Sequence, residues 1–79
     1  MISPFQIYHL VKYPAKSMNG DGSCSFTLHN HYPIEECGII VDPIDWLNTR
    51  ISPSHNLDLN DYPFTILEDG NTFTITFKY

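Results

Sequence analysis

Basic residues are scarce in this sequence, and their scarcity limits what the protein binds. Lysine and arginine together number four among 79 residues, against nine aspartates and glutamates, for a formal net charge of -5. Eight of the nine acidic residues lie between positions 35 and 69, where Arg50 is the single basic residue. Such a segment repels a phosphate backbone, so we expect no direct binding of nucleic acid.

Long apolar runs and cysteines are also few. No apolar run approaches the roughly 18 residues that span a bilayer, so we expect no membrane association. The first residues lack a basic segment followed by an apolar core, which is the pattern of a secretion signal. The two cysteines, Cys24 and Cys37, allow one disulfide, whereas small secreted scaffolds hold several. The sequence therefore predicts a cytoplasmic protein with reduced thiols.

Catalytic motifs are absent as well. The chain has no glycine loop that cradles a phosphate, no G-x-S-x-G elbow and no H-E-x-x-H helix. A chain of 79 residues also leaves little room for a pocket of about 300 Å³ or more, the usual size of a small-molecule site. We therefore expect a protein that is not an enzyme and that has no cofactor.

What the sequence does contain is enough apolar surface for one core. Hydrophobic residues make up 42% of the chain and aromatic residues 14%. A disordered chain lacks this density of phenylalanine, tyrosine and isoleucine, and 79 residues fit the usual size of one domain. We expect a single small domain over residues 1–79.

Three short strands are predicted in the first half of the chain. Residues 5–13 alternate between two faces, and Pro14 would end such a strand. Residues 24–29 alternate in the same way, after a loop at 17–23 with Asn-Gly and Asp-Gly steps. These two strands are predicted to form a hairpin. The apolar run at 38–41 predicts a third, buried strand.

The clearest local signal is a helix over residues 42–50. Asp42 suits the N-cap, Pro43 suits the first helical position, and Asp45 places a negative charge in the first turn. Apolar residues then recur at helical spacing as far as Ile51, and the Ser-Pro step that follows ends the helix. This segment therefore predicts a helix of about two turns.

The end of the chain predicts a hairpin. Residues 64–68 and 71–79 flank Asp69-Gly70, which is a favoured two-residue turn. With that turn as the loop, Ile66 lies opposite Phe73 and the apolar residues of both strands share one face.

The sum of these elements is β-β-β-α-β-β. This order describes a small α+β domain with a largely antiparallel sheet of four to five strands and one short helix. Residues 52–63, between the helix and the last hairpin, hold two prolines and no sustained periodicity. They predict a long loop, and a loop of that length in a small domain is often functional.

One group of side chains suits a metal ion. Cys24, His29, His31 and Cys37 follow a C-x4-H-x-H-x5-C spacing, and tetrahedral zinc prefers thiolate and imidazole ligands. The sequence has neither a C-x2-C nor an H-x3-H knuckle, however. A strand also places His29 and His31 on one face only if it continues through Asn30. The alternative is that the cysteines are buried and the histidines lie in a loop.

Aromatic and acidic side chains together suit a protein-binding surface. Five tyrosines and one tryptophan are many for a chain of this size, and both types are over-represented in interface hot spots. Beside the acidic segment at 35–69, they predict a patch that docks on a basic partner. Some of these aromatic side chains would equally complete the core. The expected contact residues are Asp42, Asp45, Trp46, Asp58, Asp61 and Tyr62.

These features favour a non-catalytic inhibitor that occupies a basic, normally nucleic-acid-binding, site on another protein. No motif in the chain identifies a family. Small proteins of phages and plasmids, including anti-CRISPR proteins and DNA mimics, are often built this way, and the likeness is one of size and charge alone. Two alternatives are a toxin-neutralising immunity protein and a metal-supported structural or regulatory domain. A homodimer formed through the edge strand of the last hairpin is a further alternative.

Overall fold

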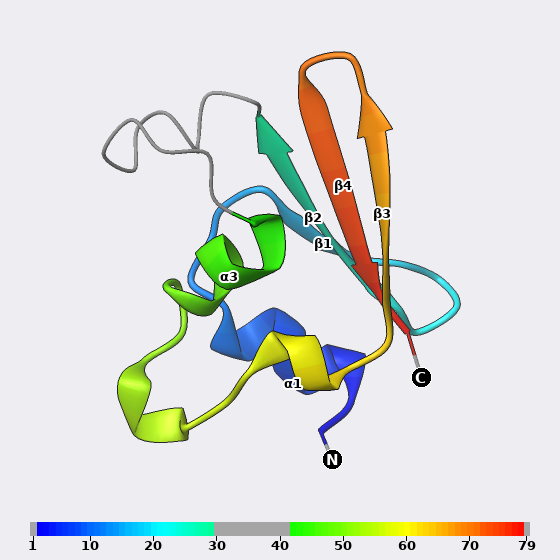
Figure 1. The fold of residues 1–79 in the computed structure, drawn as a ribbon. Helices are drawn as coiled ribbons and strands as arrows, with labels where there is room; N and C mark the ends of the chain where they lie inside the picture. The colour runs from blue at the N-terminus through cyan, green and yellow to red at the C-terminus, as the bar shows by residue number, and fades with distance from the viewer. Residues whose placement is uncertain (1, 30–41, 79) are drawn as a thin grey trace.

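A four-stranded antiparallel sheet, in the order β1-β2-β4-β3, forms the larger part of the fold (Figure 1). The computed structural model describes residues 2–29 and 42–78. Helical segments supply the other half of the core, so the predicted class, a small α+β domain with a largely antiparallel sheet, is confirmed. The described strands are β1 Lys16–Met18, β2 Cys24–His29, β3 Phe64–Asp69 and β4 Thr72–Phe77. The described helices are α1 Pro4–Leu10 and α3 Pro43–Asn48, and the described 3-10 turns are η1 Pro53–His55 and η2 Leu59–Asp61.

The strand predicted at residues 5–13 is wrong, because most of this segment forms helix α1. Ser3 caps the helix: its hydroxyl accepts from the Gln6 amide at 3.4 Å, and the Gln6 side chain accepts from the Ser3 amide at 2.9 Å. This reciprocal capping box, with Pro4 at the first helical position, satisfies the free amides that would otherwise oppose a helix start.

The burial of α1 follows the helical period and not the period of two. Pro4, Ile7 and Val11 are buried, at spacings of three and four residues, whereas Phe5 and His9 are exposed. A run of nine residues with large side chains on both faces fits the period of a helix as well as that of a strand. The capping box then favours the helix. The order β-β-β-α-β-β is therefore wrong at its first element.

The predicted first hairpin uses a later and shorter partner strand. β1 pairs with β2 across the loop at residues 19–23. Lys16 fastens this strand to α1: its ammonium donates to the carbonyl oxygens of Tyr8 at 2.6 Å and Val11 at 3.0 Å. A cation at a helix C-terminus is favourable because the last carbonyls have no helical partner. The third strand predicted at residues 38–41 lies outside the described residues.

The two central strands, β2 and β4, carry the sheet's share of the core. Alternate residues point onto the helical layer, and the residues between them form a face of serine and threonine. On that second face the Ser25 and Thr76 hydroxyls lie 3.0 Å apart. The fully buried sheet residues are Cys24, Phe26 and Leu28 of β2, and Ile75 and Phe77 of β4.

The hairpin of β3 and β4 forms as predicted, with its turn one residue further along the chain. Gly70 and Asn71 make the two-residue loop, and Gly70 has a φ of +57°. A positive φ at the first loop position is what a type II′ turn requires of glycine. Ile66 consequently lies opposite Ile75 and not Phe73. Because the register differs from the predicted one by two residues, the same side chains stay on the same face.

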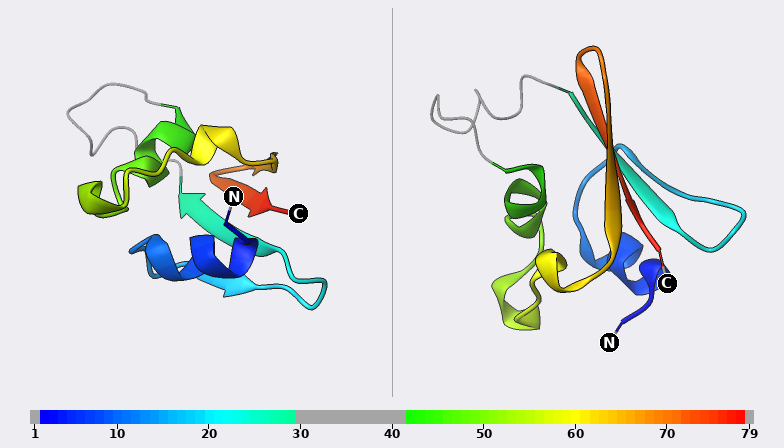
Figure 2. Two further views of the ribbon diagram at one scale, coloured as in Figure 1. Left: turned by 90° about the horizontal axis from the view of Figure 1, so that it is seen from below. Right: turned by 45° about the vertical axis from the view of Figure 1, so that its right-hand side comes forward.

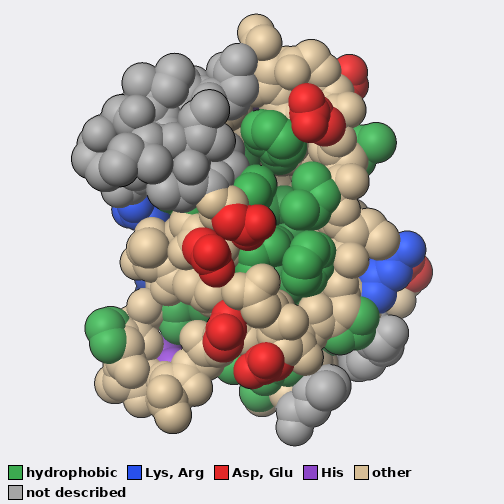
Figure 3. Space-filling model, viewed as in Figure 1, with side chains coloured by type: hydrophobic (Ala, Val, Ile, Leu, Met, Phe, Trp, Pro, Cys, Tyr) green, Lys and Arg blue, Asp and Glu red, His purple; other side chains and the backbone are tan. Residues whose placement is uncertain are grey.

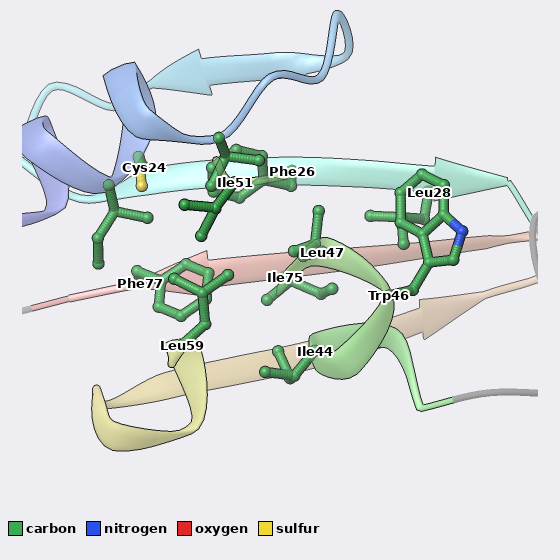
Figure 4. Packing of buried hydrophobic residues seen from close by; sticks show 12 residues of the cluster. Cys24, Phe26, Leu28, Ile44, Trp46, Leu47, Ile51, Leu59, Ile75 and Phe77 are labelled. Atoms are coloured by element: carbon green, nitrogen blue, oxygen red, sulfur yellow. The ribbon is translucent and has the colours of Figure 1, made fainter. Parts of the chain in front are cut away.

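Helix α3 confirms the predicted helix and its cap. One carboxylate oxygen of Asp42 accepts from the amides of Ile44 at 2.8 Å and Asp45 at 3.3 Å, and Pro43 holds the first helical position. The right-hand view of Figure 2 shows α3 and both 3-10 turns on one side of the sheet. Figure 4 shows Leu47 of α3 pointing toward the two central strands. Burial of a side chain of this size contributes about 1.5–3 kcal/mol.

Candidate protein-binding face

Four exposed carboxylates lie on the part of the molecule formed by α3 and η2. Figure 3 shows acidic side chains gathered over these two elements. α3 and η2 pack against each other, which brings together two pairs of aspartates that are more than ten residues apart in the chain. We call this set the acidic face, and its members are Asp42, Asp45, Asp58 and Asp61.

Two members of the acidic face hold their places because they cap helical turns. Asp42 caps α3, and Asp58 caps η2 by accepting from the Asn60 amide at 2.9 Å. Hydrogen bonds from the Asn60 amide and from the Asn48 and Asn60 side chains lower the pKa of Asp58 from its usual range. This carboxylate is therefore ionised at neutral pH, and its position is set by the backbone.

Two asparagines, which the sequence analysis did not single out, connect the parts of the acidic face. The Asn60 side chain donates to Asp45 and to Asp58, both at 3.0 Å. The Asn48 side chain donates to Asp58 at 2.9 Å and accepts from the Leu59 amide at 2.9 Å. The Asp-x-Asn spacing of the η2 cap is the sequence signal for this turn, because an aspartate commonly binds the backbone two residues on.

The charge of the acidic face is not offset by the partners that hold it. The hydrogen bonds to Asp42, Asp45 and Asp58 come from backbone amides and asparagine side chains. The Lys16 ammonium binds the end of α1, and the Arg50 guanidinium lies 4.5 Å from the Trp46 ring centre. In Figure 3 the visible basic side chains lie at the left and right edges of the view, to either side of the acidic side chains over α3 and η2.

A hollow of about 620 Å³ adjoins the acidic face. A chain of 79 residues therefore does leave room for a hollow of this size, contrary to the prediction. The hollow lies between the end of α3 and the loop at residues 52–63, which turns back at Asn56 with a φ of +49°. Asparagine adopts this left-handed conformation more readily than most residues. The polar side chains of the lining include Asn48, Ser52, Asn56, Asp58 and Asp61.

Trp46 is not available to a partner, which corrects its prediction as a contact residue. Its side chain is 8% exposed and belongs to the hydrophobic core. The Tyr13 ring packs edge-on against it, with ring centres 5.4 Å apart. The physical reason is that α3 buries three apolar side chains, Ile44, Trp46 and Leu47, so the side chain expected to flank the core is enclosed as well.

The tyrosines of the described residues also pack against the core and do not form exposed anchors. Tyr8, Tyr13 and Tyr62 are half-buried and contact the core cluster. The Tyr13 hydroxyl donates to the Thr27 carbonyl at 3.0 Å, and this hydrogen bond holds the tyrosine side chain against β2. Tyr62 lines a smaller apolar groove of about 220 Å³ beside the start of α1. The remaining tyrosines, Tyr32 and Tyr79, lie outside the described residues.

The geometry of β2 does not support the four-ligand metal site. Cys24 is buried on the helical face, whereas His29 is exposed on the opposite face, about 16 Å along the strand. One ion cannot contact both side chains. His31 and Cys37 lie outside the described residues. Among the residues that are described, no cluster of three or more His, Cys, Asp or Glu side chains is placed to hold a metal.

Cys24 is also a poor nucleophile. Its thiol is free, and burial raises its pKa to about 11, against a smaller opposing effect of a backbone hydrogen bond. In a Cys37→Ser variant, where one thiol remains, we expect a thiol-reactive disulfide reagent to react about a hundredfold more slowly than with a free cysteine, because the thiolate is rare at neutral pH. Absorbance of the released thiol measures this, and denaturant should restore the ordinary rate. Fast reaction of the folded variant would contradict the buried placement.

Two further observations complete the description. Within residues 2–29 and 42–78, no helix has the length and apolar character to cross a membrane. Comparison with protein-family models, with curated proteins and with solved structures finds no match to this chain. The described structure therefore characterises the protein as a small α+β domain whose acidic face carries four exposed carboxylates.

Proposed function

We propose that this protein is a non-catalytic protein-binding module whose acidic face docks on a basic, nucleic-acid-binding surface of a partner protein. The observation that carries the proposal is the placement of Asp42, Asp45, Asp58 and Asp61 on neighbouring elements, with neutral hydrogen-bond donors holding three of them. Carboxylates held by neutral donors keep their charge, and with it the negative potential that steers a basic partner.

The hollow beside the acidic face gives the proposed interface a specific feature. Its polar lining includes two aspartates, so it suits a lysine or arginine side chain of the partner. Since Trp46 is buried and Tyr62 half-buried, large aromatic anchors contribute little to this interface. The interaction is therefore mainly electrostatic, and we expect its affinity to fall steeply with salt.

The mode of action that follows is inhibition by occupancy. A protein of 79 residues with this face fills a groove that normally holds nucleic acid, as the small inhibitors of phages and plasmids, including anti-CRISPR proteins, commonly do. A nucleic-acid-binding partner of this kind places the proposed function in the cytoplasm. A toxin-neutralising immunity protein would use the same face, and the identity of the bound partner separates these two functions.

The test compares two variants with the same change in charge. Asp45→Asn with Asp61→Asn alters the acidic face without removing either capping aspartate, and Phe5→Lys with His9→Lys adds the same two units of positive charge at exposed positions of α1. Immobilised wild-type protein is expected to capture a basic nucleic-acid-binding protein from host lysate at low salt and to release it at about 0.5 M salt. We expect the first variant to lose at least about tenfold of this binding and the second to keep it.

Mass spectrometry identifies the captured protein, and titration with that purified protein measures the loss. Circular dichroism checks that both variants remain folded. Equal binding by the two variants would show that the acidic face is not the docking surface.

A further inference from the structure

The strand β3 forms a long edge of the sheet with no neighbour on its outer side among the described residues. It lies at the end of the strand order and pairs along six residues with β4 on its inner side. Within the described part of the chain no segment lies along its outer side (Figure 1). The opposite edge is the three-residue strand β1, and short strands are one way in which proteins protect an edge. β3 is twice as long, its pairing is continuous without a bulge, and its charged residues, Glu68 and Asp69, lie only at one end.

The hydrogen-bonding pattern of the hairpin determines which backbone groups of β3 face outward. The two-residue loop closes on the pair Asp69 and Thr72, and the Lys78 amide donates to the Pro63 carbonyl at 3.3 Å. Antiparallel pairs alternate between those that exchange hydrogen bonds and those that do not. The odd-numbered residues of β3 therefore bond to β4. The residues that direct their amides and carbonyls away from the sheet are Phe64, Ile66 and Glu68.

The centre of this edge is apolar on both faces. Ile66 is 41% exposed on the helical face and Leu67 is 66% exposed on the other face. They are two of the four large hydrophobic side chains that the described residues expose, and they are neighbours in one strand. Two adjacent apolar side chains beside a row of unpaired backbone groups are the features of a strand that pairs with another strand.

We propose that the protein forms a homodimer by antiparallel pairing of β3 with β3 of a second copy. The two-fold axis passes through Ile66, so Ile66 lies opposite its own counterpart and Phe64 lies opposite the partner subunit's Glu68. This register uses all three outward-facing residues of each strand and forms about six backbone hydrogen bonds. Registers centred one residue away use fewer of them. The described strands, four from each copy, then form one continuous sheet.

The charges of the strand favour a second copy in the antiparallel direction. Parallel pairing in register would place Glu68 and Asp69 beside their own counterparts, which is destabilising. In the antiparallel register Asp69 lies opposite the partner's Pro63, and the partner's Lys78, which follows β4 and bonds to that proline's carbonyl, lies on the same face. Leu67 lies opposite the partner's Thr65, with the partner's Leu67 on the diagonal, within reach of long side chains. The antiparallel register therefore separates the like charges and brings the two copies of Leu67 within reach of each other.

The symmetry has a consequence for the rest of the surface. An antiparallel pairing within one sheet has its two-fold axis perpendicular to the sheet, so both helical layers lie on the same side. The dimer then presents two acidic faces in the same direction. The dimer itself is independent of any function of those faces, because it depends on β3 alone.

Light scattering coupled to size-exclusion chromatography of the full chain tests the proposal. We expect a dimer for the wild type, and a monomer for Ile66→Lys and for Ile66→Pro at the same concentration, with the dissociation constant raised at least about tenfold. Proline at this position removes an outward amide and no hydrogen bond to β4, so it leaves the hairpin paired. The matched control is Met18→Lys, which alters the opposite edge at a side chain of similar exposure, 37%, and should remain dimeric.

Disulfide cross-linking tests the register. In a Cys37→Ser background, Ile66→Cys should form a cross-linked dimer on oxidation, because opposed residues of a hydrogen-bonded pair lie about 5.5 Å apart. Phe64→Cys should not, since the two copies of that position lie four residues apart along the strands. A wild type that is monomeric, a dimer that persists in both Ile66 variants, or cross-linking at position 64 with none at position 66 would overturn the proposal.

Discussion

Replacement of Phe26 with alanine is expected to lower the free energy of unfolding by about 3–5 kcal/mol. Phe26 is fully buried in the central strand β2, opposite Ile75, and its ring packs edge-on against Phe77 with centres 5.9 Å apart. Truncation removes the burial of the ring and leaves a cavity that rigid strands on both sides cannot close. A domain of this length has about 4–12 kcal/mol of total stability, so the loss is a large share of it.

Urea unfolding followed by circular dichroism measures this change, with the midpoint and slope recorded for both proteins. The matched control is Phe5→Ala, the same substitution at a side chain that is 55% exposed on α1. We expect it to cost less than about 1 kcal/mol. Similar losses for the two variants would mean that the strand β2 does not lie at the centre of the core.

Replacement of Asn48 with alanine is expected to cost about 1–3 kcal/mol and to release the loop that carries half of the acidic face. The Asn48 side chain accepts from the Leu59 amide, which lies in a half-buried position, and donates to Asp58. Alanine leaves that amide without its acceptor and removes one of the hydrogen bonds that lower the pKa of Asp58. Both changes separate η2 from α3.

The Asn48→Asp variant sharpens this prediction through its pH dependence. The new carboxylate still accepts from the Leu59 amide, but it stands where an amide donated to Asp58 at 2.9 Å. Two carboxylates at that distance share a proton, so the pKa of the pair is raised in the folded state. A raised folded pKa means that stability is present at low pH and is lost as pH rises through it. We therefore expect the melting temperature to fall between pH 4 and pH 7, relative to wild type.

Thermal melts from pH 4 to pH 7 separate the two substitutions, because the deficit of Asn48→Ala should change little over that range while that of Asn48→Asp grows. Ser54→Ala, at an exposed position of the same loop, serves as the control and should remain close to wild type. If Asn48→Asp followed the wild-type profile, the contact between Asn48 and Asp58 would not be present in solution.

The predictions from sequence succeeded where the signal was local. Helix α3 was predicted because Asp42 and Pro43 act within one turn, and its cap forms as expected. The last hairpin was predicted because alternation and a glycine turn agree, and it fails by one residue only in the position of the turn. In both segments, interactions between residues close in the sequence are enough to favour one type of secondary structure.

The prediction for α1 failed although a local signal was present. Ile-Ser-Pro occurs at residues 2–4 and 51–53, and each occurrence starts a helical segment, α1 and η1. The strand at residues 5–13 was predicted from the alternation of large side chains alone, without the capping residues Ser3 and Gln6. Alternation over so short a run fits a helix as well as a strand, whereas a capping box satisfies particular amides and favours the helix alone.

The sequence alone determined the class of the fold, the position of α3, the faces of the last hairpin and the acidic character of the protein. These depend on composition and on interactions within one or two turns of chain. Only the tertiary structure decided that α3 and η2 lie together, that Asn48 joins them, and that Trp46 is enclosed. The reason is that side-chain burial and the joining of loops depend on contacts between segments far apart in the chain, which no local pattern records.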